Sequence, residues 1–172
     1  MLVVGLDLSI RCTGMVALPS AFARTFEWSA VRHRIVESKA VPTGVRERTE
    51  RLVTIAEEIA EWVSARSPDV IALEEQAFNQ GFAHSREIGE LTGIVKARLL
   101  GLGVPIVTVP ATTARKTLLG KVPRKGSKDA VSSVLRRMGA PWTGTDRSDA
   151  FAIANHVLST HGHPAVTVRE AA

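Results

Sequence analysis

The N-terminal run from Leu2 to Ser9 constrains the fold of this chain most. It reads Leu-Val-Val-Gly-Leu-Asp-Leu-Ser, an apolar run that contains one carboxylate, Asp7. A continuous Leu/Val run is typical of a strand buried on both faces of a sheet. An ionised carboxylate in such a strand is costly unless a cation or hydrogen bonds compensate it. The sequence therefore predicts a buried first strand whose Asp7 needs a partner.

Two later segments carry acids in similar settings. An apolar run that begins at Val70 ends in Glu74 and Glu75, and only one of these two adjacent side chains is expected to face Asp7. Asp146 and Asp149 open the last helical pattern, and their spacing puts both on one helix face. A purely structural reading makes them an N-cap and a first-turn acid. If the three segments meet, they form an acidic pocket suited to a divalent metal.

Such a cluster repels itself unless a cation joins it. The pattern lacks His and Cys, and hard oxygen ligands select Mg²⁺, with Mn²⁺ as a substitute, over zinc. Two such ions about 3.5–4 Å apart activate a water and stabilise the leaving oxygen of a phosphodiester. The residues therefore point to hydrolysis of a nucleic-acid backbone.

The order of apolar patterns predicts an α/β fold. Its mixed five-stranded sheet has three antiparallel strands followed by parallel strands, with helices on both faces. Residues 1–160 form one nuclease domain, and residues 161–172 are expected to be a flexible tail. The predicted segments are a hairpin over Leu2–Leu18, a loop over Ser20–Ala30, strands at Arg32–Ala40, Asp69–Glu74 and Val104–Val109, and helices at 45–67, 85–102, 111–119, 127–138 and 146–160.

Composition and charge limit the class of protein and the kind of partner further. The chain has 172 residues, a net charge of +5 and a pI near 10.0, which permits a polyanionic partner. The single Cys12 excludes an intramolecular disulfide and a cysteine-rich zinc site. No signal peptide or membrane span is recognised, so a cytoplasmic location is expected. Gly89 and Gly93 in a predicted helix suggest close approach of another backbone, by default the sheet, otherwise a second subunit or nucleic acid.

Three motifs together resemble the RuvC-type Holliday-junction resolvases, members of the ribonuclease H-like superfamily. They are Val4–Ser9 with Thr13-Gly14, Ile71–Glu74 with Phe78, Gly89 and Gly93, and Asp146–Ala150. Their order and spacing hold from Leu2 to about Ser159. The resemblance implies a metal-dependent endonuclease that acts as a homodimer, each subunit nicking one strand of a four-way DNA junction. It implies a bacterial or phage-encoded protein.

The resemblance assigns roles to particular residues. Asp7, Glu74, Asp146 and Asp149 match the family's catalytic metal ligands. Counting from Gly89 and Gly93 favours Glu74, whereas counting from Phe78 favours Glu75 as the alternative ligand. Lys116 and Lys128 resemble basic residues near the scissile phosphate. The predicted DNA contacts are Phe78, Arg115, Lys116, Lys121, Arg124, Lys125 and Lys128.

Three alternatives remain open from the sequence. A nuclease of the same fold could cut flaps, other branched DNA or RNA, because fold alone does not decide the substrate. The segment Gly5–Ser9 with Thr13-Gly14 also looks like the first phosphate-binding hairpin of actin-like ATPases, although the chain is short and shows no second hairpin. A non-catalytic DNA-binding module would leave the buried acids unexplained.

Overall fold

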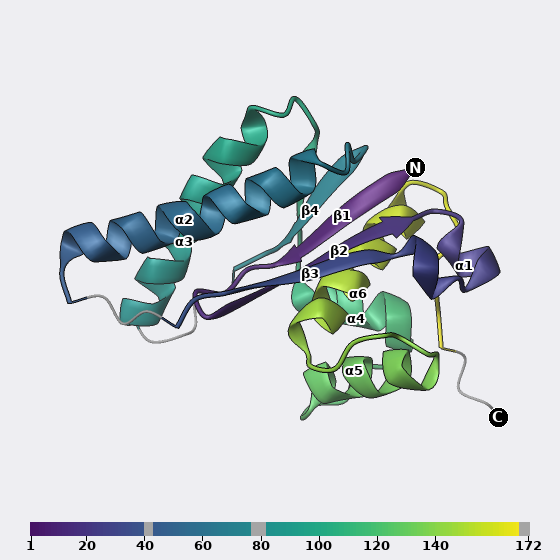
Figure 1. Cartoon of the computed structure of the whole chain (residues 1–172). Helices are drawn as coiled ribbons and strands as arrows, with labels where there is room; N and C mark the ends of the chain where they lie inside the picture. Colours follow the sequence, from purple (N-terminus) through teal and green to yellow (C-terminus); the bar gives the residue numbers. More distant parts are fainter. Residues whose placement is uncertain (40–42, 77–81, 169–172) are drawn as a thin grey trace.

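The computed structural model describes residues 1–39, 43–76 and 82–168. Within them, five strands form one mixed sheet in the order β3-β2-β1-β4-β5 (Figure 1). The antiparallel pairs are β1 with β2 and β2 with β3, and the parallel pairs are β1 with β4 and β4 with β5. The predicted topology is confirmed. The strands are β1 (Leu2–Asp7), β2 (Cys12–Pro19), β3 (Arg32–Glu37), β4 (Val70–Glu74) and β5 (Ile106–Val109).

The sheet is covered by helices on both faces, as predicted (Figure 1). Two hydrophobic cores result, because the β1 and β2 side chains alternate between the faces: Val3 and Val16 belong to one core, Val4 and Met15 to the other. The helices α2 (Val45–Ser64) and α3 (Phe82–Leu100) pack on one face. The opposite face carries α4 (Ala111–Leu119), α5 (Ser127–Arg137) and α6 (Asp146–Thr160).

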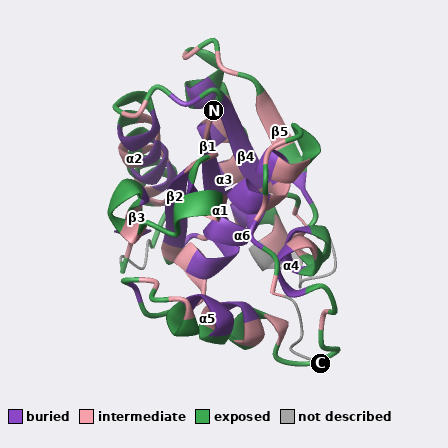
Figure 2. Ribbon diagram, turned by 90° about the vertical axis from the view of Figure 1, so that its right-hand side faces the viewer, coloured by how far each residue is buried: buried purple, intermediate pink, exposed green. Residues whose placement is uncertain are grey.

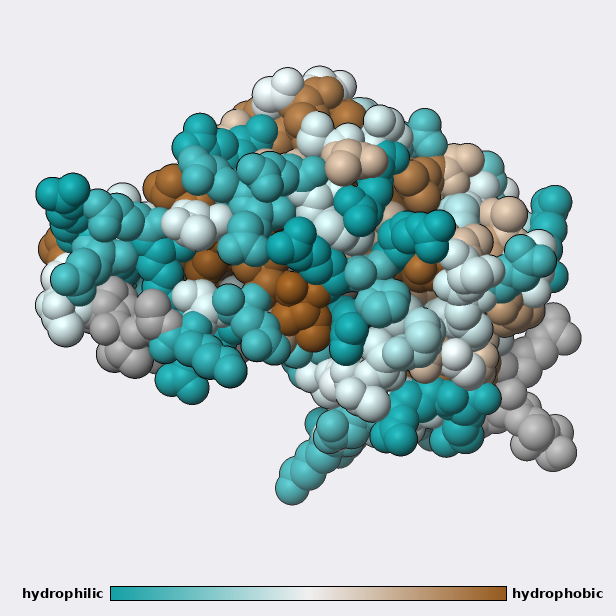
Figure 3. All heavy atoms as spheres, viewed as in Figure 1, coloured by the Kyte–Doolittle hydropathy of each residue, from teal (hydrophilic) through white to brown (hydrophobic). Residues whose placement is uncertain are grey.

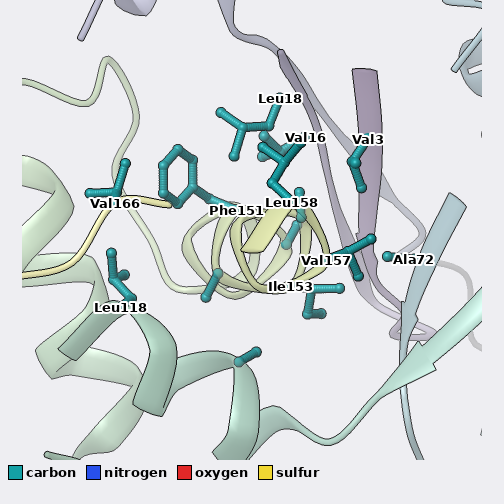
Figure 4. Close-up of a cluster of buried hydrophobic side chains, with 14 of the residues drawn as sticks. Val3, Val16, Leu18, Ala72, Leu118, Phe151, Ile153, Val157, Leu158 and Val166 are labelled. Carbon is teal, nitrogen blue, oxygen red and sulfur yellow. The ribbon is translucent and has the colours of Figure 1, made fainter. Parts of the chain in front are cut away.

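Helix α6 is the most deeply buried helix of the described chain. It lies against β1, β2 and α4, and Figure 2 shows it buried in the middle of the molecule. Its small residues, such as Ala150 and Ala154, are completely buried where the helix meets the sheet. Phe151 points into the core that also contains Leu118 and Val166 (Figure 4). This close packing holds the N-terminus of α6 at one end of the sheet.

The segment after β2 is more ordered than the predicted loop over residues 20–30. It contains a short helix α1 (Phe22–Thr25) and a 3₁₀ turn at Trp28–Ala30. Phe22 is buried and contacts Trp28 and Phe151 edge-on, with ring centroids 4.7 and 5.6 Å apart. These aromatic contacts hold residues 20–30 against the core and stabilise the two short turns. The sequence of this segment shows no clear helical period.

The segment after α6 docks on the core, so the prediction of a loose tail is wrong for its described part. Val166 is buried, and its backbone exchanges two hydrogen bonds with the side-chain amide of Asn155, at 2.7 and 2.9 Å. The backbone N–H of Val168 donates to the carbonyl of Leu118 at 2.8 Å. Asn155 lies inside a helix, where sequence reasoning assigns it no partner.

The surface facing the viewer in Figure 3 is mostly hydrophilic, with small separate hydrophobic patches. No helix in the described part of the chain is both long and apolar enough to cross a membrane. Gly89 and Gly93 of α3 do not pack against the sheet: a Cβ at either position would meet no described atom within 4 Å. The default explanation for these two glycines is therefore wrong.

Candidate metal-dependent nuclease site

Two carboxylates meet at the carboxyl ends of β1 and β4. The strands are parallel neighbours, with Leu6 opposite Leu73, so Asp7 and Glu74 follow at the same edge of the sheet. Asp7 is 5% exposed, and the Oε2 atom of Glu74 is buried without a hydrogen-bond partner. Burial, followed by the adjacent carboxyl group of Glu74, raises the pKa of Asp7 well above its usual value. Burial and mutual repulsion therefore make it unfavourable for both carboxyl groups to ionise unless a cation lies between them.

Helix α6 adds a third carboxylate, Asp149. Its side chain is buried, and Arg115 of α4 donates two hydrogen bonds to it, each 2.9 Å long. Arg115 is itself 8% exposed and donates a further hydrogen bond to Ser127 Oγ at 3.2 Å. A bidentate pair of this kind holds the carboxylate in one orientation. Arg115 therefore connects α4, α5 and α6 behind the acids.

Lys128, the second residue of α5, lies between two of the acids. Its ammonium nitrogen is 3.3 Å from Asp149 Oδ2 and 3.8 Å from Asp7 Oδ2, while its side chain stays 48% exposed. Burial alone would lower the pKa of Lys128, but the neighbouring Asp7 and Asp149 outweigh it and raise the pKa. Lys128 is therefore a charged group that contacts both the acids and the solvent.

Asp146 has its described hydrogen-bond partner outside this cluster. Its Oδ2 atom accepts a hydrogen bond from the thiol of Cys12 at 3.3 Å, and the raised pKa of Cys12, about 11, keeps the sulfur protonated. Asp146 thus contacts β2, whereas Asp149 contacts α4 and α5, although both stand in the first turn of α6. The N-cap is Thr145, so the reading of Asp146 as the helix cap is wrong.

Two glycines allow α6 to lie close enough to the sheet to build the site. A Cβ on Gly5 of β1 would overlap the carbonyl oxygen of Ala150, and a Cβ on Gly14 of β2 would overlap the backbone of Asp146. Gly14 also stands directly opposite Asp7 in the antiparallel register. Any side chain at these positions would move α6, and its two aspartates, away from Asp7.

The other predicted site residues that the structure describes differ from the acids in their exposure. Glu75 is exposed, in contrast to Glu74. Lys116 is also exposed, and its neighbour Arg115 takes the inward position on α4, so Arg115 is a partner of Asp149 and not a free DNA contact. Phe78 lies outside the described residues. The remaining three, Lys121, Arg124 and Lys125, are exposed on the loop between α4 and α5.

The acids fit a divalent metal by their chemistry. Among the described residues, no three acidic, His or Cys side chains already converge as a complete ligand set. The Oε2 atom of Glu74 is nevertheless buried without a hydrogen-bond partner, and burial together with Glu74 raises the pKa of Asp7 even though Lys128 lies close to it. Carboxylate oxygens are the donors that Mg²⁺ prefers. Asp7, Glu74 and Asp149 would hold such an ion, with Asp146 one helical turn away.

Comparisons with known proteins agree with this geometry. A family model described as crossover junction endodeoxyribonuclease RuvC matches residues 3–157. A protein of that name from Sorangium cellulosum (strain So ce56) is 32% identical over 116 residues, which cover 67% of this chain and 64% of the relative. The match thus spans less than two thirds of that relative's length. The relative from Acidiphilium cryptum (strain JF-5) is 25% identical over 154 residues, covering 88% of this chain and 87% of its own.

The structural likeness covers nearly the whole chain. The solved structure described as T. thermophilus RuvC in complex with Holliday junction substrate matches with a TM-score of 0.70 at 21% identity, covering 94% of this chain and 96% of that one. At this identity the likeness concerns the fold, and it confirms the predicted ribonuclease H-like architecture. The family match extends over β1, β4 and α6, the elements that carry the acids. The chain therefore belongs to the RuvC family of crossover junction endodeoxyribonucleases.

Proposed function

We propose that this chain is a Mg²⁺-dependent endonuclease that resolves Holliday junctions. The observation that supports the proposal is the meeting of Asp7, Glu74 and Asp149 at one edge of the sheet, with an unpartnered buried oxygen on Glu74. A nuclease needs such oxygens to hold metal against a phosphodiester. Because the proposed substrate is DNA and the similar RuvC proteins come from bacteria such as Sorangium cellulosum and Acidiphilium cryptum, we propose the bacterial cytoplasm or nucleoid as its location.

Each residue of the proposed site has a separate role in metal binding or phosphate binding. Asp7, Glu74 and Asp149 would hold the metal, and Asp146 would join them if its side chain left Cys12. Two bound divalent ions, Mg²⁺ or Mn²⁺, would supply an activated water and stabilise the leaving oxygen. Lys128 balances the acids before metal binds, and its half-exposed side chain supports a role in contacting the scissile phosphate. Arg115 keeps the Asp149 carboxylate in position.

Paired nicking requires two such sites. The described chain contains one acidic cluster, so we propose that a homodimer supplies one cluster to each of two opposed junction strands. The test uses a synthetic four-way junction, a flap and a plain duplex, each incubated with the protein and Mg²⁺. We expect two symmetric nicks in the junction and at most slow cutting of the other two. A cleaved flap beside an intact junction would favour the alternative, a flap or branched-DNA nuclease of this fold.

The loop between α4 and α5 is expected to bind the DNA backbone. Lys121, Arg124 and Lys125 are exposed on it, and the flanking helices carry Arg115 and Lys128 to the acids. Replacing Arg124 and Lys125 together by Ala should weaken junction binding. It should also reduce the slope of log affinity against log salt by about 1 for each phosphate that is no longer neutralised. Fluorescence anisotropy across a salt series measures both.

The matched control removes the same charge from the other end of α5. Arg136 and Arg137 are exposed in its last turn, roughly 12 and 13.5 Å along the helix from Lys128 at 1.5 Å per residue. Their double Ala variant should keep a steeper salt slope than the loop variant. Equal slopes for the two variants would mean that net charge, and not this loop, sets the affinity.

A further inference from the structure

The strand β3 is an edge of the sheet, and in the described chain it pairs only with β2. Figure 2 shows it at the margin of the molecule, and α2 is the helix that lies against it. Alternate backbone N–H and C=O groups of an edge strand face away from the sheet and can pair with another chain. The outer side of β3 therefore offers a row of backbone donors and acceptors with the spacing of an extended peptide.

Two arginines lie along this edge on one face of the sheet. Arg32 and Arg34 are exposed, and they stand opposite Ala17 and Met15 of β2, whose side chains belong to the core under α2 and α3. Cross-strand partners lie on the same face of a sheet, so both arginines lie on the α2 side. The helices α4 and α5, which flank the loop proposed to bind DNA, pack on the opposite face. The two basic surfaces are therefore separated by the sheet.

A third arginine, Arg66, extends this basic surface just after α2. Its guanidinium carbon lies 3.8 Å from the centroid of the Trp62 ring, and its Nη1 atom donates to the Trp62 carbonyl, so two contacts hold the side chain. Burial, followed by the charges of Arg34 and Arg32, lowers the pKa of Arg66. The three cations therefore repel one another, and a negatively charged ligand would relieve this repulsion.

The charge of this surface is only partly neutralised within the described chain. Of the three arginines, only Arg34 has an ion pair there, with Glu58 of α2 at 3.2 Å, and both side chains are exposed. Exposed pairs of this kind contribute little to stability, so Arg34 can exchange Glu58 for another carboxylate. Charge complementarity therefore favours an acidic partner, and the edge strand favours one with an extended backbone.

We propose that β3 binds an extended acidic segment of a partner protein, which adds a strand to the sheet and places carboxylates against Arg32, Arg34 and Arg66. Residues i and i+2 of the added strand lie on one face, as Arg32 and Arg34 do on β3. Backbone hydrogen bonds supply affinity in this mode of recognition, and the arginines supply specificity for acids. The inference does not depend on the nuclease proposal, because these arginines lie outside the acid cluster.

The test measures binding of a short fluorescein-labelled peptide that alternates Glu with Thr, by anisotropy at low salt. Replacing Arg32 and Arg34 together by Ala should weaken binding roughly tenfold, because two exposed ion pairs are lost. The matched control, the double Ala variant of Arg136 and Arg137, removes the same charge from α5 and should bind as the wild type does. Glu58→Gln frees Arg34 and should strengthen binding.

Methylation of alternate peptide nitrogens tests whether the peptide adds a strand. One set of methyl groups faces β3 and removes its hydrogen bonds, whereas the other set faces solvent, so the two peptides should differ in affinity at least about tenfold. Equal affinities for the two peptides, or for the wild type and the Arg32 and Arg34 variant, would overturn the proposal. A loss of affinity seen with duplex DNA but not with the peptide would assign the surface to nucleic acid. Self-association of that variant with unchanged peptide binding would leave the arginines as guards of the sheet edge.

Discussion

Asp7→Asn is expected to abolish Mg²⁺-dependent cleavage of a four-way junction while junction binding stays within a fewfold of wild type. The substitution removes a proposed metal ligand from the centre of the acid cluster, and even partners outside the ligand shell are worth about 10–100-fold. Cleavage should therefore fall by at least about 100-fold. Gel assays of cleavage and anisotropy of binding in the same buffer measure the two effects separately.

The same variant should be more stable than the wild type in EDTA. The pKa of Asp7 is raised in the folded state, so between its unfolded and folded pKa values the folded chain binds more protons than the unfolded chain. Wild-type stability must then fall as pH rises through this range. Asn at this position cannot ionise, and this part of the pH dependence should disappear from melting curves.

Asp129→Asn is the matched control, because Asp129 is an exposed acid in the first turn of α5. It should leave cleavage and the pH dependence of melting unchanged. Persistent cleavage by Asp7→Asn would remove Asp7 from the metal site. Lower stability of that variant in EDTA would contradict the raised pKa.

Gly5→Ala is expected to have the largest effect on stability. Its Cβ would overlap the Ala150 carbonyl oxygen and would stand 3.0 Å from the backbone nitrogen of Ala154. Both atoms belong to the α6 backbone and cannot rotate away, so α6 must shift from β1. Overpacking of this kind costs about 1–3 kcal/mol or more. That is a large part of the roughly 5–15 kcal/mol by which domains are stable.

The shift should also reduce cleavage by the molecules that remain folded, because α6 carries Asp149 towards Asp7. Urea unfolding gives the stability, and cleavage assayed well below the unfolding transition gives the activity. Gly93→Ala is the control: the same atom is added in open space, and a small gain in stability is expected. A Gly5→Ala protein as stable and active as the control would mean that the close contact of α6 with β1 does not build the site.

Much of the fold could be predicted because its signals are local. The apolar run of β1, the change to helical spacing after Val45, and the apolar run that ends at Glu74 each report on neighbouring residues. Their order then limits the topology, since a strand, helix, strand succession favours parallel pairing. The helix α6 begins and ends where its pattern predicts, at Asp146 and Thr160.

The segments for which the sequence prediction is wrong depend on distant contacts. The turns at residues 22–30 follow from Phe22 packing on Trp28 and Phe151, and the docking of Val166 depends on Asn155. Neither set of partners has a fixed spacing in the sequence. Arg115 and Lys116 show the same limit, because adjacent cations on a helix differ only in the direction that their side chains take.

By itself, the sequence determined which acidic residues the chain carries and at which ends of its strands and helices they lie. An ionised Asp7 in a buried strand needs a cation, and the later acids were expected to lie beside it. Both expectations follow from the sequence because charge and burial are properties of residue type and pattern. Only the tertiary structure decided how the acids are arranged. It joined Asp149 to Arg115 and Lys128 and turned Asp146 towards Cys12. Those choices depend on how closely α6 approaches the sheet, which long-range packing sets.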